Sequence, residues 1–237
     1  MNSASLTPAQ PLLPTHPAPE AEPSTAPPFS VTLQERMGKG RRAWIASGIH
    51  PREIPALKRT HAYLREHHPS LVLIFTLADP RYAYETTARL RFHRLRTLRH
   101  SDTATDDDQA EAYWVDTDHE ATLLAAHMAA ECAFIGSTLV AGGSPNPTAA
   151  ARAALPMVAG DQGTLWGCAS CPASMAAVQR LERSGALRRV HSTEQLPSAL
   201  ADLLVQGAAL PRALGLHVQR TVLQATDQGF TARYPNG

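Results

Sequence analysis

The segment AWIASGIHPRE, residues 43–53, passes from an apolar run into a turn and then into the start of a helix. Residues 43–47 have the short, apolar and aromatic character of a buried strand. Pro51 suits the first position of a helix, because its φ already matches the helix and its missing N–H would have had no partner there. The segment therefore predicts a strand, a turn and a helix, which is the repeating unit of parallel sheets.

The same alternation of strands and helices continues along the rest of the chain. Residues 71–76, LVLIFT, form a continuous apolar run, as a strand covered on both faces requires. Further strands are expected at residues 95–98, 113–115, 132–136, 156–159 and 187–190, and further helices at 81–93, 120–130, 146–154, 173–184 and from about 194 and 211. The pattern predicts an α/β fold with a single Rossmann-like, doubly wound parallel sheet.

The first forty residues have a different composition. They contain many prolines, interleaved with Ala, Ser, Thr and Glu, and few large apolar side chains. Proline removes backbone donors and blocks helix formation, and so little apolar surface does not offset the entropy of ordering the chain. We therefore expect residues 1–40 to be a disordered leader and linker, and residues 41–237 to form one folded domain.

Composition excludes several classes of protein. An apolar fraction of 43% and a formal charge of +1 disfavour a nucleic-acid partner, which usually requires a strong positive field. The three cysteines are too few, and odd in number, for a disulfide framework, so a cytoplasmic protein is expected. No apolar run approaches the roughly 20 residues that cross a bilayer, and no signal peptide is recognisable.

Three segments are expected at the carboxyl ends of strands, where a doubly wound sheet binds its ligands. They are residues 47–53, 116–120 and the Gly/Ser-rich stretch 136–147, which ends at a helix start. Glycines let the backbone approach a phosphate, and a helix N-terminus favours an anion. Taken alone, a glycine-rich turn more often only reverses the chain.

Together, the three segments resemble the C-terminal donor-binding domain of the 3-deoxy-D-manno-octulosonic acid (Kdo) transferases. The family has Ala-Ser-Thr-His with a following Glu, then Asp-Thr-Met-Gly-Glu-Leu, Ala-Phe-Val-Gly-Gly-Ser-Leu and Gly-Gly-His-Asn-Pro-Leu-Glu. This chain has similar residues in the same order: Ala46–His50 with Glu53, Asp116-Thr117 with Glu120, residues 133–140, and Asn146-Pro147. The likeness extends over about residues 40–165.

The resemblance implies the C-terminal half of a GT-B glycosyltransferase, with residues 41–237 as a Rossmann-like nucleotide-sugar-binding domain. The expected donor is CMP-Kdo, and no cofactor or metal is expected. By position in the family's motifs, the donor-binding residues would be Ser47, His50, Glu53, Glu120, Gly136, Ser137, Thr138, Gly143 and Asn146.

The chain departs from the family at several positions. The family's histidine and glutamate in Gly-Gly-His-Asn-Pro-Leu-Glu are Pro145 and Ala149 here, and alanine offers no side-chain acceptor for ribose hydroxyls. Where the family has Pro-Arg-His-Pro, this chain has Ala78-Asp79-Pro80, which exchanges positive charge for negative. We expect no counterpart of the family's N-terminal half, with its acceptor site and catalytic base, before residue 43, so the catalytic residues are unknown.

The resemblance thus implies a domain that transfers Kdo to a lipid A precursor at the inner membrane, together with a separately encoded acceptor domain. Two alternatives stay open: a degenerate module that acts through a protein partner, and a transferase for another nucleotide-sugar.

Simpler interpretations apply to the remaining polar groups. Cys168 and Cys171 are half a metal site at most, and Asp118 is more simply a helix cap than a metal ligand. The arginines between residues 89 and 99 form a solvated face more readily than one that meets anionic lipid or an acidic partner.

Overall fold

The computed structural model describes residues 33, 35–38, 40–99, 110–116, 120–141, 146–162 and 179–207 of the 237-residue chain. Within these residues seven strands form one sheet in the order β3-β4-β2-β1-β5-β6-β7, and every neighbouring pair is parallel. The predicted α/β fold is confirmed. The strands are β1 (Ala43–Ile49), β2 (Val72–Leu77), β3 (Thr97–Arg99), β4 (Ala112–Trp114), β5 (Ala133–Ile135), β6 (Met157–Gly160) and β7 (Leu187–Val190).

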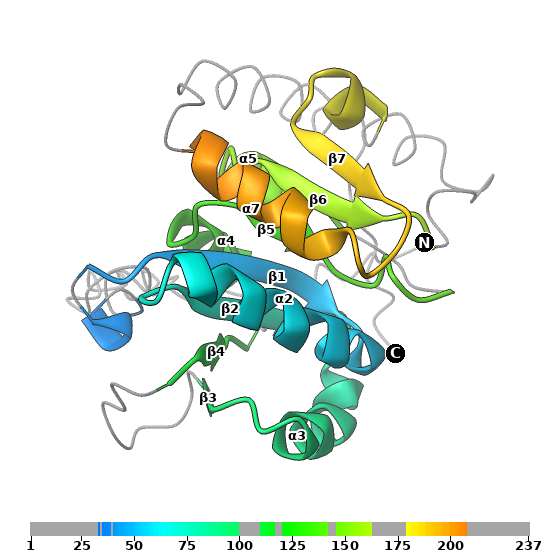
Figure 1. The fold of residues 1–237 in the computed structure, drawn as a ribbon. Helices are drawn as coiled ribbons and strands as arrows, with labels where there is room; N and C mark the ends of the chain where they lie inside the picture. Colours follow the sequence, from blue (N-terminus) through cyan, green and yellow to red (C-terminus); the bar gives the residue numbers. More distant parts are fainter. Residues whose placement is uncertain are drawn as a thin grey trace, which may run out of the picture.

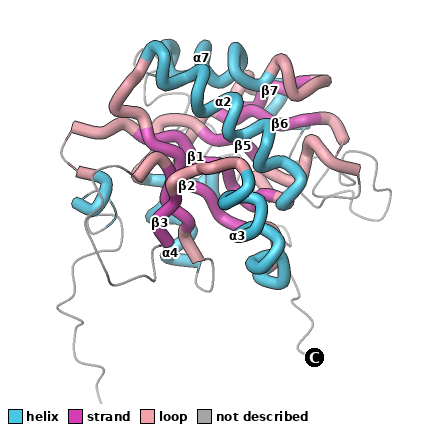
Figure 2. Tube along the Cα trace, turned by 60° about the horizontal axis from the view of Figure 1, so that its bottom comes forward, coloured by secondary structure: helices cyan, strands magenta, loops and turns pink. Residues whose placement is uncertain are grey.

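Helices cover both faces of this sheet, so it is doubly wound. Helix α2 (Ile54–His67) and helix α7 (Leu196–Gly207) lie side by side over one face, as Figures 1 and 2 show. Helix α4 (Glu120–Met128) and helix α5 (Thr148–Arg152) pack against the opposite face. Helix α3 (Ala83–Phe92) joins the α2 side through Leu90. Two short 3-10 turns, η1 (Pro51–Glu53) and η2 (Pro80–Tyr82), precede α2 and α3.

The apolar run that predicted a fully covered strand forms β2. All six of its residues are buried, and β2 pairs with β1 on one side and with β4 on the other. Apolar layers therefore lie on both faces of the strand, which explains why its sequence shows no alternation of polar and apolar residues.

The chain expected to be a linker contributes to the core. Leu33 and Met37 are buried, and both pack in the apolar layer that α4 and α5 share with the sheet. The hydroxyl of Tyr113 in β4 donates a hydrogen bond to the carbonyl of Arg36 at 2.9 Å. Two side chains that precede the predicted boundary at residue 41 are therefore part of the packed core, because apolar residues four apart on a helix share one face.

Several element ends also differ from the expectation. The strand expected at residues 95–98 is Thr97–Arg99, and the helix expected at 146–154 is shortened to Thr148–Arg152. Of the helix expected at 173–184, residues 179–183 are helical, and the remainder up to 178 lies outside the described residues. The helix expected from about 194 begins at Leu196, and the one expected from 211 lies outside the described residues.

A buried histidine links α2 to the centre of the sheet. The indole Nε1 of Trp44 donates to Nδ1 of His61 at 3.2 Å, and both side chains are almost fully buried. Burial, and then the nearby Arg65, lower the pKa of His61 to about 4. The pKa of His127 in α4 is also lowered by burial. Both groups are therefore neutral in the folded protein at neutral pH.

We predict that His61 makes stability depend on acid. An unfolded histidine takes up its proton near pH 6.5, whereas folded His61 takes it up only at about pH 4. Neutral His61 therefore contributes fully to the free energy of unfolding above pH 6.5, and this contribution is lost as the pH falls toward 4. At pH 5 the loss is about 2 kcal/mol.

The measurement compares urea unfolding of the wild type and of His61→Gln at about pH 7.5 and pH 5. Glutamine still offers an oxygen to Trp44 but does not titrate. The stability difference between the two proteins should shrink by about 2 kcal/mol at the lower pH. An unchanged difference would contradict the assignment.

Candidate functional site

The direction of chain winding reverses between β1 and β5. After β1 the chain enters α2 on one face, and after β5 it enters α5 on the other, although the two strands are hydrogen-bonded neighbours. Such a switch point opens a crevice at the carboxyl edge of a parallel sheet, where ligands commonly bind. Two segments meet there: residues 48–53, which include the end of β1 and the turn after it, and residues 136–139, which follow β5.

One buried carboxylate joins these two turns. The side chain of Glu53 reaches across the edge, and the residue is only 1% exposed. Its Oε2 accepts from the backbone N–H of His50 at 2.9 Å and of Ser137 at 2.7 Å. Its Oε1 accepts from the N–H of Thr138 at 3.0 Å and of Leu139 at 2.9 Å. Glu53 therefore fixes the position of each turn relative to the other.

Two opposing effects act on the Glu53 carboxylate, and the net result is a raised pKa. Burial raises the pKa of Glu53, because it removes the carboxylate from water, while the four amide N–H groups lower it by stabilising the charge. Successive N–H groups that point to one spot form an anion-binding nest. In this protein the anion in the nest of residues 137–139 is the protein's own carboxylate.

The neighbouring expected site residues also have protein partners. The hydroxyl of Ser137 donates to the carbonyl of Gly48 at 2.9 Å, and the hydroxyl of Thr138 donates to the carbonyl of Ile135 at 2.6 Å. Both residues are at most 2% exposed, and Ser47 in β1 is 5% exposed. The amides of residues 137–139 and the hydroxyls of Ser137 and Thr138 are thus engaged within the protein, and together with Glu53 they position the edge.

Glycine is required at position 136 by a close approach of two backbones. A Cβ added there would lie 2.6 Å from the carbonyl oxygen of Gly48 and from the Cα of Ile49, inside any allowed contact. The amide of Gly136 donates to the carbonyl of Ser47 at 2.7 Å. The following residue, Ser137, has a positive φ of 59°. The glycine-rich sequence at this point therefore serves the joint between β1 and β5.

His50 is the expected residue whose ring lies at the edge itself. Its Nδ1 accepts from the N–H of Arg52 at 3.2 Å, which places the ring proton on Nε2, and the ring packs edge-on against Tyr82 at 4.8 Å. Burial, followed by the charge of Arg52, lowers its pKa. A neutral imidazole with a free Nε2–H can donate a hydrogen bond to a ligand oxygen.

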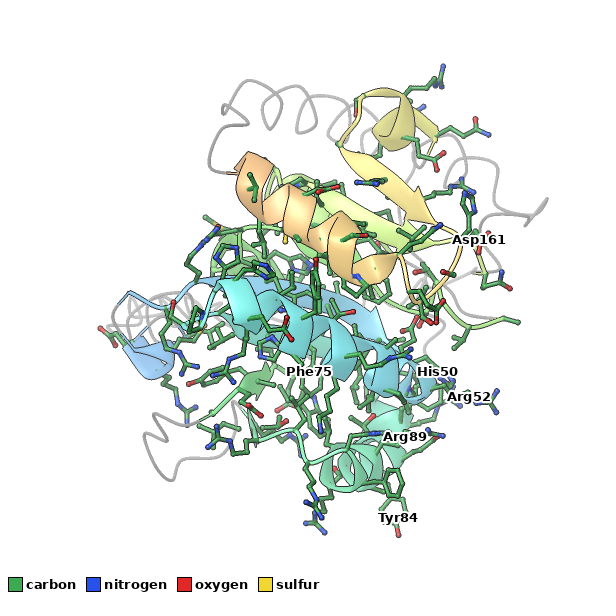
Figure 3. The ribbon with its side chains drawn as sticks, viewed as in Figure 1. His50, Arg52, Phe75, Tyr84, Arg89 and Asp161 are labelled. Carbon is green, nitrogen blue, oxygen red and sulfur yellow. The ribbon has the colours of Figure 1, made fainter. Side chains whose placement is uncertain are left out.

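Arginines that sequence reasoning did not select accompany His50. Figure 3 shows His50, Arg52 and Arg89 at the same corner of the molecule, with Asp161 beyond the end of β6 at the same edge. Arg52 is exposed, whereas Arg89 forms an ion pair with Glu85 at 2.9 Å. Arg52 could have been found from its place in the turn, but Arg89 reaches the corner from α3, which the sequence alone does not reveal.

The remaining expected residues lie toward α4 and α5. Glu120 begins α4, is largely exposed, and forms an ion pair with Arg152 of α5. The side-chain oxygen of Asn146 accepts from the N–H of Thr148 at 3.0 Å and so holds the turn that leads into α5. Gly143 lies outside the described residues. Glu120 and Asn146 are thus placed by α4 and α5, and His50 by the turn that leads into α2.

The acidic residue at position 79 does not act as a free negative charge. Its carboxylate accepts from the N–H of Arg81 at 2.9 Å, so it caps η2, and it also pairs with the guanidinium of Arg81 at 2.6 Å. Those contacts with Arg81 lower the pKa of Asp79. The departure from the family's basic pair is therefore offset locally by one arginine.

Among the residues that the structure describes, no group of three or more His, Cys, Asp or Glu side chains could hold a metal ion. Cys132 is a buried free thiol, and burial raises its pKa. The expected half-site at Cys168 and Cys171 and the residues Asp118 and His119 lie outside this part of the chain. No helix within the described ranges is long and apolar enough to span a bilayer.

Comparison with known proteins supports the fold. No protein family model matches the chain. Among solved structures, the chain is similar to the C-terminal CMP-Kdo binding domain of WaaA from Acinetobacter baumannii, with a TM-score of 0.62 and 17% identity over 84% of this chain and 94% of that one. At this identity the likeness shows a common fold.

Two longer glycosyl-transfer proteins share the architecture. An alpha,alpha-trehalose 6-phosphate synthase from Burkholderia multivorans matches with a TM-score of 0.51 and 13% identity over 84% of this chain. Anabaena Alr3699/HepE in complex with UDP and glucose matches with a TM-score of 0.51 and 12% identity over 86%. This chain spans 41% and 51% of their lengths. Its sheet thus has the fold of a GT-B glycosyltransferase domain.

We predict that Glu53→Gln lowers stability by about 2–4 kcal/mol. The amide offers one accepting oxygen, and its NH₂ group would face two N–H donors, so two buried amides lose their acceptor. Urea unfolding measures the loss, and hydrogen exchange should quicken at residues 137–139. Glu66→Gln, an exposed carboxylate on α2, is the matched control and should change stability by less than about 0.5 kcal/mol. If the two changes lowered stability equally, Glu53 would not hold the two turns together as proposed.

Gly136→Ala should destabilise the fold by about 2–4 kcal/mol, because the new Cβ meets backbone atoms that cannot rotate away. Gly185→Ala is the control: its φ is +74° with open space around the Cβ, so only the backbone conformation costs energy, about 1 kcal/mol. Thermal or urea unfolding of both variants shows which of them loses more stability. A Gly136 variant that is no less stable than the Gly185 variant would contradict the close approach.

Proposed function

We propose that this chain, which has the fold of a GT-B glycosyltransferase domain, binds a nucleotide-sugar at the carboxyl edge of its sheet, with CMP-Kdo as the donor. The observation that carries the proposal is the meeting of residues 48–53 and 136–139 at the switch point between β1 and β5. These are the segments whose sequence resembles the donor motifs of Kdo transferases. The similar fold of a domain that binds CMP-Kdo supports it further.

The donor would lie between the His50 corner and the start of α5. The Nε2–H of His50 is available to donate to a phosphate or sugar oxygen, and exposed Arg52 supplies the positive charge for an anion. CMP-Kdo carries both a phosphate and a carboxylate, which suits this charge. Asn146 would contact the donor from the α5 side, while Glu53 holds the turn that presents His50.

Kdo transfer to a lipid A precursor in lipopolysaccharide synthesis would then require a second domain for the acceptor. The chain covers nearly all of the CMP-Kdo binding domain but about half or less of the longer glycosyl-transfer proteins. An acceptor domain would supply the catalytic base and exclude water when it closes over the donor. The proposed role of this chain is therefore to bind and orient the donor.

A uridine nucleotide-sugar is the second candidate donor. One protein of similar fold binds UDP and glucose, and Ala149 lacks the carboxylate that the Kdo family places near the ribose. A degenerate module that acts through a protein partner is the third, since the amides of residues 137–139 already hold Glu53. The three candidates differ in which nucleotide stabilises the fold.

We predict that CMP raises the melting temperature by about 5–10 °C when its concentration is about 100 times its Kd, and that UDP and GDP raise it less. The Arg52→Ala variant should melt as the wild type does without ligand and lose most of the shift, because the residue is exposed. Arg183→Ala, which removes an exposed arginine that follows β6, should keep the shift.

The outcomes separate the candidates. A larger shift with UDP favours the uridine donor. Millimolar CMP, UDP and GDP that all leave the melting temperature unchanged would refute nucleotide binding and leave the partner-binding module.

A further inference from the structure

Helix α3 exposes two aromatic side chains on one face. Tyr84 is 89% exposed and Phe92 is 81% exposed, which makes them the most exposed large apolar residues of the described surface. Positions 84, 88 and 92 follow one another at four-residue intervals, so they share one side of the helix. Thr86 and Leu90 are buried on the opposite side, against the sheet. The aromatic face of α3 therefore points away from the core.

Basic side chains surround this face. Arg91 lies between the aromatic residues on the helix, and Arg94 follows the helix end, and both are exposed. Within the described residues neither forms an ion pair, whereas Glu85 is paired with Arg89, and Asp79 with Arg81. Beyond the helix a groove of about 480 Å³ is lined by arginines 91, 94, 96 and 99. The acidic groups of α3 and η2 are thus matched, whereas Arg91 and Arg94 have no acidic partner among the described residues.

We propose that the exposed face of α3, formed by Tyr84, Ala88, Arg91 and Phe92, docks on the surface of an anionic membrane. Projecting aromatic rings settle at the level of lipid headgroups, where an apolar body and a polar tip are both accommodated. Arginines beside them pair with lipid phosphates and respond to the negative surface potential. An acidic protein would match the charge equally, but protein interfaces usually enclose aromatic anchors in pockets. Here the rings of Tyr84 and Phe92 project outward, and the Phe92 ring packs edge-on against its neighbour His93.

The position of α3 gives this docking a consequence. Tyr82, in the turn just before α3, packs against His50, and Figure 3 shows Tyr84 at the corner that also holds His50, Arg52 and Arg89. Docking through α3 would therefore bring the carboxyl edge of the sheet close to the membrane surface. This inference does not depend on nucleotide binding and stands or falls separately from it.

The test is co-sedimentation of the full chain with vesicles of pure phosphatidylcholine and with vesicles in which about one third of the lipid is phosphatidylglycerol. Binding should occur to the mixed vesicles, be weak on phosphatidylcholine alone, and fall as salt is added. The double variant Tyr84→Ser with Phe92→Ser should bind roughly tenfold more weakly, and Arg91→Glu with Arg94→Glu at least as weakly.

The matched control removes exposed apolar side chains elsewhere. Met128 on α4 is 65% exposed and Val205 on α7 is 68% exposed, so Met128→Ser with Val205→Ser should leave vesicle binding unchanged. All variants should keep the wild-type melting temperature, since the changed side chains are exposed.

Absence of binding to the mixed vesicles would overturn the proposal, as would equal binding by the Tyr84/Phe92 variant and the wild type. Self-association that needs Tyr84 and Phe92, without vesicle binding, would instead identify the face as a contact between copies of the chain. The CMP melting shift is measured without vesicles, so failure of either proposal leaves the other open.

Discussion

The arrangement of the carboxyl edge depends on one buried carboxylate that accepts four backbone hydrogen bonds. Pro51 starts the 3-10 turn after β1, and the turn brings Glu53 back toward the crevice instead of out to solvent. There Glu53 holds His50 on one side and residues 137–139 on the other. Since buried N–H groups without acceptors are costly, each turn needs the other to be in place. The site therefore forms only when β1 and β5 are paired.

The same sequence character can serve either a ligand phosphate or the protein's own anion. A Gly/Ser turn at a helix start offers N–H groups and close backbone approach, and both features are present after β5. Composition does not say which anion binds the N–H groups of residues 137–139. The answer depends on whether folding brings a carboxylate from a distant part of the sequence to this place. Glu53 lies 84 residues before Ser137 in the chain. Sequence reasoning predicted that these residues lie at one edge of the sheet, where the structure places them, but it could not assign the contact between them. Their role in donor binding stays a prediction.

The fold was more predictable than the site, for a physical reason. Burial on both faces marks β2 in the sequence itself, and alternating strands and helices determine a covered parallel sheet. The place of β4 between β3 and β2, by contrast, depends on pairing between segments whose sequences carry no register signal. Leu33 and Met37 were left outside the predicted domain because two apolar residues just after a proline-rich region are too short a pattern to predict packing. Arg89 reaches the His50 corner only through tertiary structure.

The source of positive potential at the edge follows from these contacts. Because Glu53 neutralises the nest of residues 137–139, the attraction for an anion falls to side chains. His50 is neutral at neutral pH, and the pairs of Asp79 with Arg81 and of Glu85 with Arg89 cancel. Among the described residues of this corner, Arg52 therefore carries a positive charge without an ion-pair partner. An exposed guanidinium is screened by salt within about 10 Å, unlike a buried amide nest. A site built on backbone amides keeps its attraction for an anion even in contact with water. At this edge, anion binding would depend more strongly on a second surface that closes over the ligand and excludes water.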